Sequence, residues 1–195
     1  AGPIGVVEEL TDFLPDPHVR ETDDGSFEFY EPAESIGKVH GFHGNWLVLL
    51  KTYAYISRLG DGGLKDTSAM AVLNANYLAE RIDLDIPYGP FHHEFVASAG
   101  DVDAAEFAKG MLDEGVHPPT TKWPEIVDEA LMTEPTEALS KEQLDVLAAA
   151  FTAASEKTKE ELAEAPTTTA AARIDQTTAA RNPRLSWQDV GGDDE

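Results

Sequence analysis

The chain has 195 residues, 42% of them hydrophobic, which is enough to bury a sizeable core in one large domain or in a domain and a half. Its 37 acidic residues against 14 basic ones give a formal net charge of -23, so nucleic acid and anionic membranes are unfavourable partners. The sequence has no cysteine, which excludes disulfides, thiolate metal sites and a cysteine nucleophile.

The acidic residues are spread through the whole chain, and only eight lysines accompany them. Because salt screens the repulsion within such a surface, we expect a halophilic source and a cytoplasmic location. No apolar run approaches the roughly 20 residues that span a bilayer, and the start lacks the basic and apolar segments of a signal peptide. We therefore expect a soluble protein without a membrane partner.

The first 45 residues combine short strand patterns with an irregular segment. Residues 1–7 form a glycine-proline loop that leads into an apolar run, which predicts a strand. Phe27 and Phe29 alternate with polar residues after an Asp-Asp-Gly turn and predict another strand. Residues 39–45 place two histidines among glycines directly before a helix start, an arrangement that suits an anion. This segment is one candidate binding site.

A long helical pattern follows at residues 46–82, with a glycine-rich break at 60–63. Proline and glycine at 87–90 then mark a boundary. Beyond it we expect a strand at 92–99 and a helix that has Asp101 as its N-cap and ends at Gly115.

The stretch 115–136 organises the remainder of the chain. It begins with a proline-rigidified polar turn whose side chains can form hydrogen bonds, made of His117, Pro118, Pro119, Thr120 and Thr121. We expect a strand at 130–133 and then a helix at 140–163, which begins with the capping-box pair Ser140 and Gln143. The polar turn is the second candidate binding site, although hydrogen-bonded turn residues without a ligand would have the same pattern.

The patterns divide the chain into four parts: a domain end at 1–45, a helical linker at 46–86, a small α+β domain at 87–165 and an extended tail at 166–195. The tail is rich in threonine and alanine without a useful periodicity, which is typical of a flexible segment. Its apolar residues near 182–187 would allow it to return to the body. We expect its last residues to be disordered.

Several motifs together resemble one family closely. They extend from residue 1 to about residue 187 and include Gly2-Pro3-Ile4-Gly5-Val6, Ser35-Ile36-Gly37-Lys38-Val39, Gly115-Val116-His117-Pro118-Pro119-Thr120 and Leu131-Met132-Thr133-Glu134-Pro135-Thr136-Glu137. On these motifs the chain resembles the C-terminal part of the P-protein family, glycine dehydrogenase (decarboxylating), in the separate-subunit form called subunit 2.

The resemblance implies an α/β fold, the C-terminal portion of a fold type I pyridoxal phosphate enzyme with an α+β small domain. It places residues 1–45 at the end of the large domain that binds pyridoxal phosphate. The family decarboxylates glycine and passes the aminomethyl group to the lipoylated H-protein of the glycine cleavage system. The implied partners are therefore glycine, the lipoylated H-protein and glycine dehydrogenase subunit 1.

The family's Schiff-base lysine lies in a His-Lys-Thr motif shortly before a glycine-rich run, and this chain starts inside that run. We therefore expect the covalent lysine outside this chain and no catalytic residue within it. The resemblance assigns cofactor binding to Gly2, Gly5, His43 and Asn45. It assigns substrate binding to His117, Thr120 and Thr121.

Two other functions stay open. One is a non-catalytic module that keeps the surface for a partner subunit or for the H-protein. The other is a metal site built from histidines, which is the least favoured, because His92 and His93 on one strand would point to opposite faces. We therefore assign no metal ligand.

Overall fold

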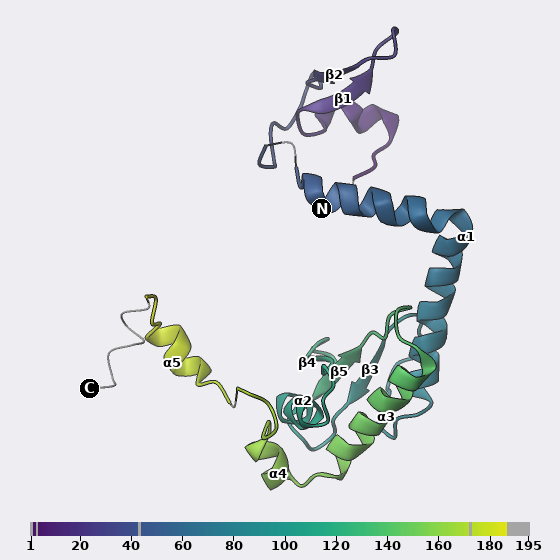
Figure 1. The fold of residues 1–195 in the computed structure, drawn as a ribbon. Helices are drawn as coiled ribbons and strands as arrows, with labels where there is room; N and C mark the ends of the chain where they lie inside the picture. The colour runs from purple at the N-terminus through teal and green to yellow at the C-terminus, as the bar shows by residue number, and fades with distance from the viewer. Residues whose placement is uncertain (1, 3, 43, 172, 187–195) are drawn as a thin grey trace. The chain divides into compact units, whose positions relative to one another are not determined.

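The computed structural model describes residues 2, 4–42, 44–171 and 173–186. Contacts between residues divide the chain into two units, Ala1–Leu64 and Lys65–Glu195. Figure 1 shows the elements of each unit. In this described part of the chain, no helix is both long and apolar enough to cross a membrane. The four-part division predicted from the sequence stays a prediction.

The first unit contains a 3-10 helix, η1 (Glu8–Phe13), and an antiparallel hairpin of β1 (His18–Glu21) and β2 (Phe27–Tyr30). The predicted strand at Phe27 is confirmed. The predicted strand within residues 1–7 is wrong, because the described residues there are exposed and pair with no strand in this part of the unit. A strand needs a partner for its backbone groups, and the two strands that form here partner each other.

The turn of this hairpin is held by polar side chains. The carboxylate of Asp24 accepts hydrogen bonds from the Thr22 hydroxyl at 2.6 Å and from the Ser26 amide at 3.0 Å. These bonds, with that from Thr22 the strongest, lower the pKa of Asp24 to about 2. The predicted Asp-Asp-Gly turn is thereby confirmed.

The helix α1 (Trp46–Ala79) extends through the boundary between the units. It is interrupted at Gly60 alone, whose φ of 64° and ψ of -175° lie outside the helical region and suit only glycine. The predicted break at 60–63 is therefore narrower than expected, and the helix ends before residue 82. In the second unit, the buried Ala75 and Leu78 of this helix join the core.

The second unit is built on an antiparallel sheet in the order β3 (Phe95–Ser98), β5 (Ala130–Thr133), β4 (Thr120–Thr121). β5 is central, with Phe95 opposite Thr133 and Thr121 opposite Leu131. The predicted strand at 130–133 is confirmed, whereas the strand predicted at 92–99 is shorter. His92 and His93 precede it, so they do not alternate across a strand.

In the described part of this unit, four more helices follow: α2 (Ala104–Asp113), α3 (Lys141–Glu156), α4 (Lys159–Glu164) and α5 (Gln176–Arg181). The core joins α2 and α3 to the sheet through buried apolar side chains, with the rings of Phe107 and Phe151 6.1 Å apart. Figure 1 shows α2 and α3 beside the three strands. Burial of these large side chains is the main stabilising term of this unit.

The N-cap of α2 is Asp103, not the predicted Asp101. The Asp103 carboxylate accepts the backbone N–H groups of Ala105 at 2.9 Å and Glu106 at 3.2 Å. Asp101 lies two residues earlier, in a turn that the hydrogen bond from the Val102 amide to the Ala99 carbonyl closes at 3.3 Å. A side chain in that turn is too far from the helix start to accept these N–H groups.

The helix predicted at 140–163 is two helices. Its start is confirmed, because Ser140 and Gln143 form a capping box. Thr158 and Glu161 form a second capping box at the start of α4, after Lys157 has taken an extended backbone conformation. A Thr-x-x-Glu sequence inside a helical pattern therefore begins a new helix here.

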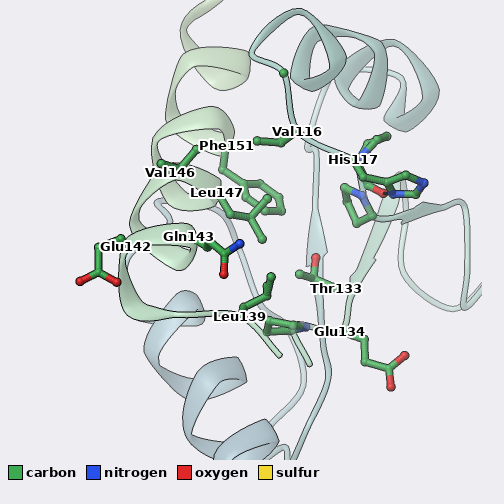
Figure 2. Close-up of a pocket in the computed structure, with 14 residues that line it drawn as sticks. Val116, His117, Thr133, Glu134, Leu139, Glu142, Gln143, Val146, Leu147 and Phe151 are labelled. Atoms are coloured by element: carbon green, nitrogen blue, oxygen red, sulfur yellow. Dashed lines mark hydrogen bonds between the residues drawn. The ribbon is translucent and has the colours of Figure 1, made fainter. Parts of the chain in front are cut away.

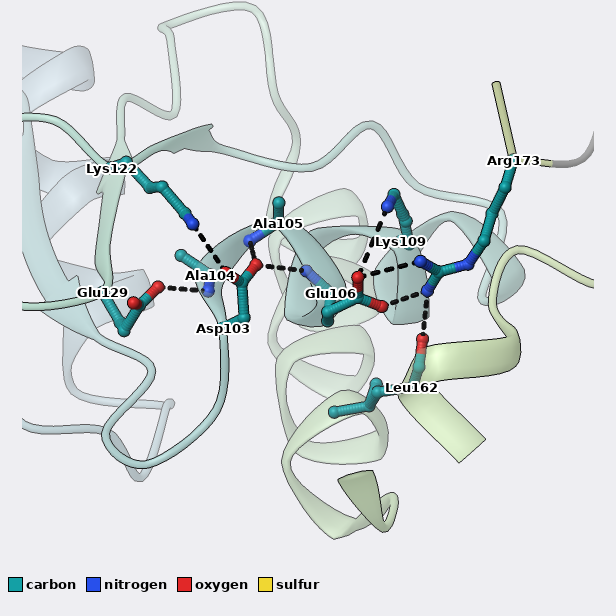
Figure 3. Close-up of polar contacts among 9 residues, drawn as sticks. All are labelled: Asp103, Ala104, Ala105, Glu106, Lys109, Lys122, Glu129, Leu162 and Arg173. Carbon is teal, nitrogen blue, oxygen red and sulfur yellow. Dashed lines mark hydrogen bonds and ion pairs between the residues drawn. The ribbon is translucent and has the colours of Figure 1, made fainter. Parts of the chain in front are cut away.

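Polar contacts hold the start of the tail against α2. The backbone N–H groups of Thr167 and Thr168 donate to Asp113 Oδ1 at 2.6 Å and 2.8 Å. Arg173 donates to both carboxylate oxygens of Glu106 and to the Leu162 carbonyl, as Figure 3 shows. The bonds from Arg173 lower the pKa of Glu106. This part of the tail is therefore ordered, and the last residues, predicted to be disordered, lie outside the described residues.

Close packing in the second unit brings α2 against α4. A Cβ at Gly110 would lie 2.4 Å from Cδ2 of the buried Leu162. We expect Gly110→Ala to lower the free energy of unfolding by about 1–3 kcal/mol, although alanine favours a helix, because the overpacked methyl must displace Leu162. Denaturant unfolding followed by circular dichroism measures this change.

The matched control is Gly62→Ala in α1, where a Cβ would meet nothing within 4 Å. We expect it to leave the free energy of unfolding unchanged or to raise it by up to about 1 kcal/mol. Equal destabilisation by both substitutions would show that the α2–α4 contact does not require glycine.

Candidate functional site

Three of the four cofactor-site candidates are described, and these lie in the first unit and are open to solvent. Gly2, Gly5 and Asn45 are exposed, and a Cβ at either glycine would meet nothing within 4 Å. His43 lies outside the described residues. Within the described part of this unit, no other group therefore lies close to either glycine.

The substrate-site candidates lie on the segment that joins α2 to the sheet. Gly115, with a φ of 76°, ends α2, and its N–H donates to the Leu112 carbonyl at 2.9 Å. His117 follows in an exposed turn, where its Nδ1 lies 2.9 Å from the Pro118 carbonyl oxygen. Thr120 and Thr121 were predicted to belong to this turn. They form β4 instead, because their backbone pairs with β5.

A cavity of about 550 Å³ lies between this turn, the end of β5 and one face of α3. Apolar side chains form most of its wall, among them Val116, Leu139, Leu147 and Phe151. Figure 2 shows these side chains between α3 and the turn, with His117 on the turn side. His117 therefore borders the cavity, whereas Thr120 and Thr121 are not among the described residues that line it.

The polar groups at the cavity already have partners. The Gln143 side chain accepts the Ser140 backbone N–H at 2.8 Å in the capping box. The buried Thr133 hydroxyl donates to the Leu131 carbonyl at 3.3 Å. Figure 2 shows the carboxylates of Glu134 and Glu142 directed away from the cavity. The arrangement suits binding of an apolar group beside one imidazole more than a reaction by converging charges.

The lysines of this chain do not fit the covalent link to pyridoxal phosphate. A lysine that links to such a cofactor is usually desolvated so that its amine is neutral. None of the eight lysines is buried, and four of them, Lys109, Lys122, Lys141 and Lys157, form ion pairs with carboxylates. Among the described histidines and acidic residues, no group of three is placed to hold a metal ion.

A polar cluster that the sequence reasoning missed joins α1 to α3. The Tyr77 hydroxyl donates to Asp145 and accepts from Arg81 Nη2 at 2.7 Å, and Lys141 Nζ lies 2.7 Å from Asp145. Lys141 is the largest cause of the lowered pKa of Asp145. The sequence contains two pairs of residues at i, i+4 spacing that indicate these local contacts, Tyr77 with Arg81 and Lys141 with Asp145. Their convergence required the tertiary structure.

Comparison with known proteins identifies a family that this chain matches. The family model described as "Glycine dehydrogenase, C-terminal domain" matches residues 67–178. A probable glycine dehydrogenase (decarboxylating) subunit 2 from Halobacterium salinarum is 68% identical over 190 residues, which cover 97% of this chain and 40% of that protein. A protein of the same name from Thermus thermophilus is 44% identical over 196 residues, which cover 98% of this chain and 41% of that protein.

A solved structure, glycine decarboxylase (P-protein) of the glycine cleavage system in inhibitor-bound form, has a similar fold with a TM-score of 0.63. The two sequences are 21% identical, and the match covers 75% of this chain and 37% of the chain in the solved structure. The resemblance and the α/β fold predicted from the sequence are thereby confirmed. The chain spans about 40% of the length of the curated relatives, and the roles of the candidate site residues stay predictions.

We expect a substitution in the buried wall of the cavity to lower the free energy of unfolding more than a substitution at its exposed rim. Phe151 is 1% exposed and packs against Phe107, whereas Val146 is 57% exposed on the same helix. We expect Phe151→Ala to lower the free energy of unfolding by about 3–5 kcal/mol, because it removes a buried ring and enlarges the cavity. Val146→Ala should change it by no more than about 0.5 kcal/mol. Denaturant unfolding measures both, and a small effect at Phe151 would contradict the packing described.

Proposed function

Because the chain belongs to the glycine dehydrogenase C-terminal domain family, we propose that it works as the C-terminal portion of a decarboxylating glycine dehydrogenase subunit 2. The observation that carries this proposal is the 68% identity to the Halobacterium salinarum protein along 97% of this chain. The complete subunit would release carbon dioxide from glycine and pass the aminomethyl group to the lipoylated H-protein, together with subunit 1.

The proposal places the cofactor lysine outside this chain. Pyridoxal phosphate supplies an electron sink for decarboxylation when it is bound. In this proposal Gly2, Gly5, His43 and Asn45 line the cofactor side of the site only when the remainder of the subunit is present. The acidic composition, with a formal net charge of -23, supports a protein that works in a salt-rich cytoplasm.

His117 is the residue of this chain that we assign to substrate contact, with Thr120 and Thr121 beside it on β4. Its position supports this role, because the turn is exposed and its backbone is restricted by two following prolines. When Nδ1 donates to the Pro118 carbonyl, 2.9 Å away, Nε2 is left as an acceptor. The imidazole would then accept a hydrogen bond from an ammonium or amide group of the substrate.

We expect His117→Ala in the complete subunit to lower kcat/KM for glycine decarboxylation by about 10- to 100-fold, the effect of losing one hydrogen bond to a charged group. The experiment uses a subunit in which this chain replaces the matched portion of the Halobacterium salinarum relative. The control is His92→Ala, an exposed histidine away from the cavity. Unchanged decarboxylation in the His117 variant would contradict the assignment.

A labelling experiment tests whether the covalent cofactor lysine lies outside this chain. We expect the purified chain, mixed with pyridoxal phosphate in high salt and treated with borohydride, to retain no stoichiometric label on one lysine, because no lysine is desolvated. Absorbance and peptide mass spectrometry measure the label. A single labelled lysine at one equivalent would show that this chain carries a cofactor site of its own.

A further inference from the structure

The loop between β4 and β5, residues 122–129, exposes two large apolar side chains. Trp123 is 55% exposed and Ile126 is 73% exposed, whereas Val127 between them and the sheet is 6% exposed. The loop is therefore fixed to the body by Val127 while its tryptophan and isoleucine face solvent. Tryptophan is among the residue types that most often dominate binding at protein interfaces.

Both ends of this loop have a backbone conformation that side chains other than glycine rarely adopt. Lys122 has a φ of 59° and Glu129 a φ of 47°. Such conformations are unfavourable for these residue types and persist only where surrounding contacts hold them. Strained residues of this kind are often found at ligand-binding and switch segments.

Contacts at both ends hold the strained conformation. Lys122 Nζ donates to Asp103 Oδ2 at 2.6 Å, and Glu129 Oε2 accepts the Ala104 backbone N–H at 2.6 Å. Figure 3 shows both side chains at the first turn of α2. The Ser98 hydroxyl also donates to the Asp128 carbonyl at 2.8 Å. The loop is thus ordered before any partner arrives, which lowers the entropy cost of binding.

The charges of the loop indicate what kind of surface it fits. Lys122 is already paired with Asp103, so the charges left beside the apolar side chains are those of the exposed Glu125 and Asp128. A complementary surface therefore has an apolar pocket with basic groups at its rim. The matched relatives have more than half of their length outside the aligned region, which is chain enough to carry such a surface.

We propose that the 122–129 loop docks this domain onto the part of the subunit that lies outside the present chain, with Trp123 and Ile126 in an apolar pocket that has a basic rim. This inference rests on the proposed function, because the occupant is the remaining portion of a glycine dehydrogenase subunit.

The test compares the chain with the complete subunit in which it replaces the matched portion of the Halobacterium salinarum relative. Hydroxyl-radical footprinting with mass spectrometry measures the reactivity of Trp123, with Tyr88, 57% exposed, as the matched reference. We expect the reactivity of Trp123 relative to Tyr88 to fall at least about tenfold in the complete subunit, as for a residue buried at an interface core. Equal relative reactivity in the two proteins would overturn the proposal.

A pair of variants provides the second measurement. Trp123→Ser should lower the melting midpoint of the complete subunit by several degrees more than that of the chain, because Trp123 is 55% exposed in the chain and would be fully buried in the complete subunit. If Tyr88→Ser has the same effect on the complete subunit, or if Trp123 is protected only in a dimer of the chain, the proposal is overturned. Release of carbon dioxide from glycine is assayed separately. A subunit that protects Trp123 but is inactive contradicts the proposed function and not the docking.

Discussion

The second unit depends on the burial of β5 between its two neighbouring strands and under the helices. Both other strands of the sheet pair with β5, and its residues Ala130 and Leu131 are fully buried. The strand therefore determines where β4 ends and where the loop of residues 122–129 begins. It also determines where α3 starts, since the chain leaves β5 at Thr133 and reaches the capping box at Ser140 after a short connection. The exposed Trp123 lies on the connection that leads into β5, and the cavity is lined in part by Thr133 at the end of this strand.

Ion pairs and hydrogen bonds within the chain neutralise some of its many carboxylates, in addition to screening by salt. Two of its few cations join segments that are far apart in the sequence, Arg173 with Glu106 and Lys157 with Glu114. Each pair lies near the surface, so its contribution to stability is modest. Together these pairs hold the tail and α4 against α2, and Asp113 adds hydrogen bonds from the two threonines that follow Pro166. Charge repulsion elsewhere on the surface makes this selective use of cations more important.

Membership of the family is visible along most of the chain, whereas the groups of the proposed site do not come together within it. The motifs extend from residue 1 to about residue 187, and two relatives from different organisms are 68% and 44% identical over 97% and 98% of this chain. The structure by itself does not assemble the proposed site, since nothing lies within 4 Å of a Cβ placed at Gly2 or Gly5 and none of the lysines is buried. The exposed apolar residues of β2 and of the first half of α1 are consistent with a unit that is covered in that larger protein.

The sequence alone determined the features that depend on neighbouring residues. The capping box at Ser140, the strand at Ala130 and the turn before Phe27 are local patterns, and the structure confirms each of them. Asp103 in place of Asp101, the division of the last long helix at Thr158 and the joining of Thr120 to a sheet were decided by the tertiary structure. The reason is that each depends on a competition between local signals, which packing and strand pairing resolve.

The cavity beside His117, the contact of Arg173 with Glu106 and the strained ends of the Trp123 loop involve residues remote in sequence. No local pattern encodes such contacts, because burial and backbone pairing bring these residues together only in the folded chain.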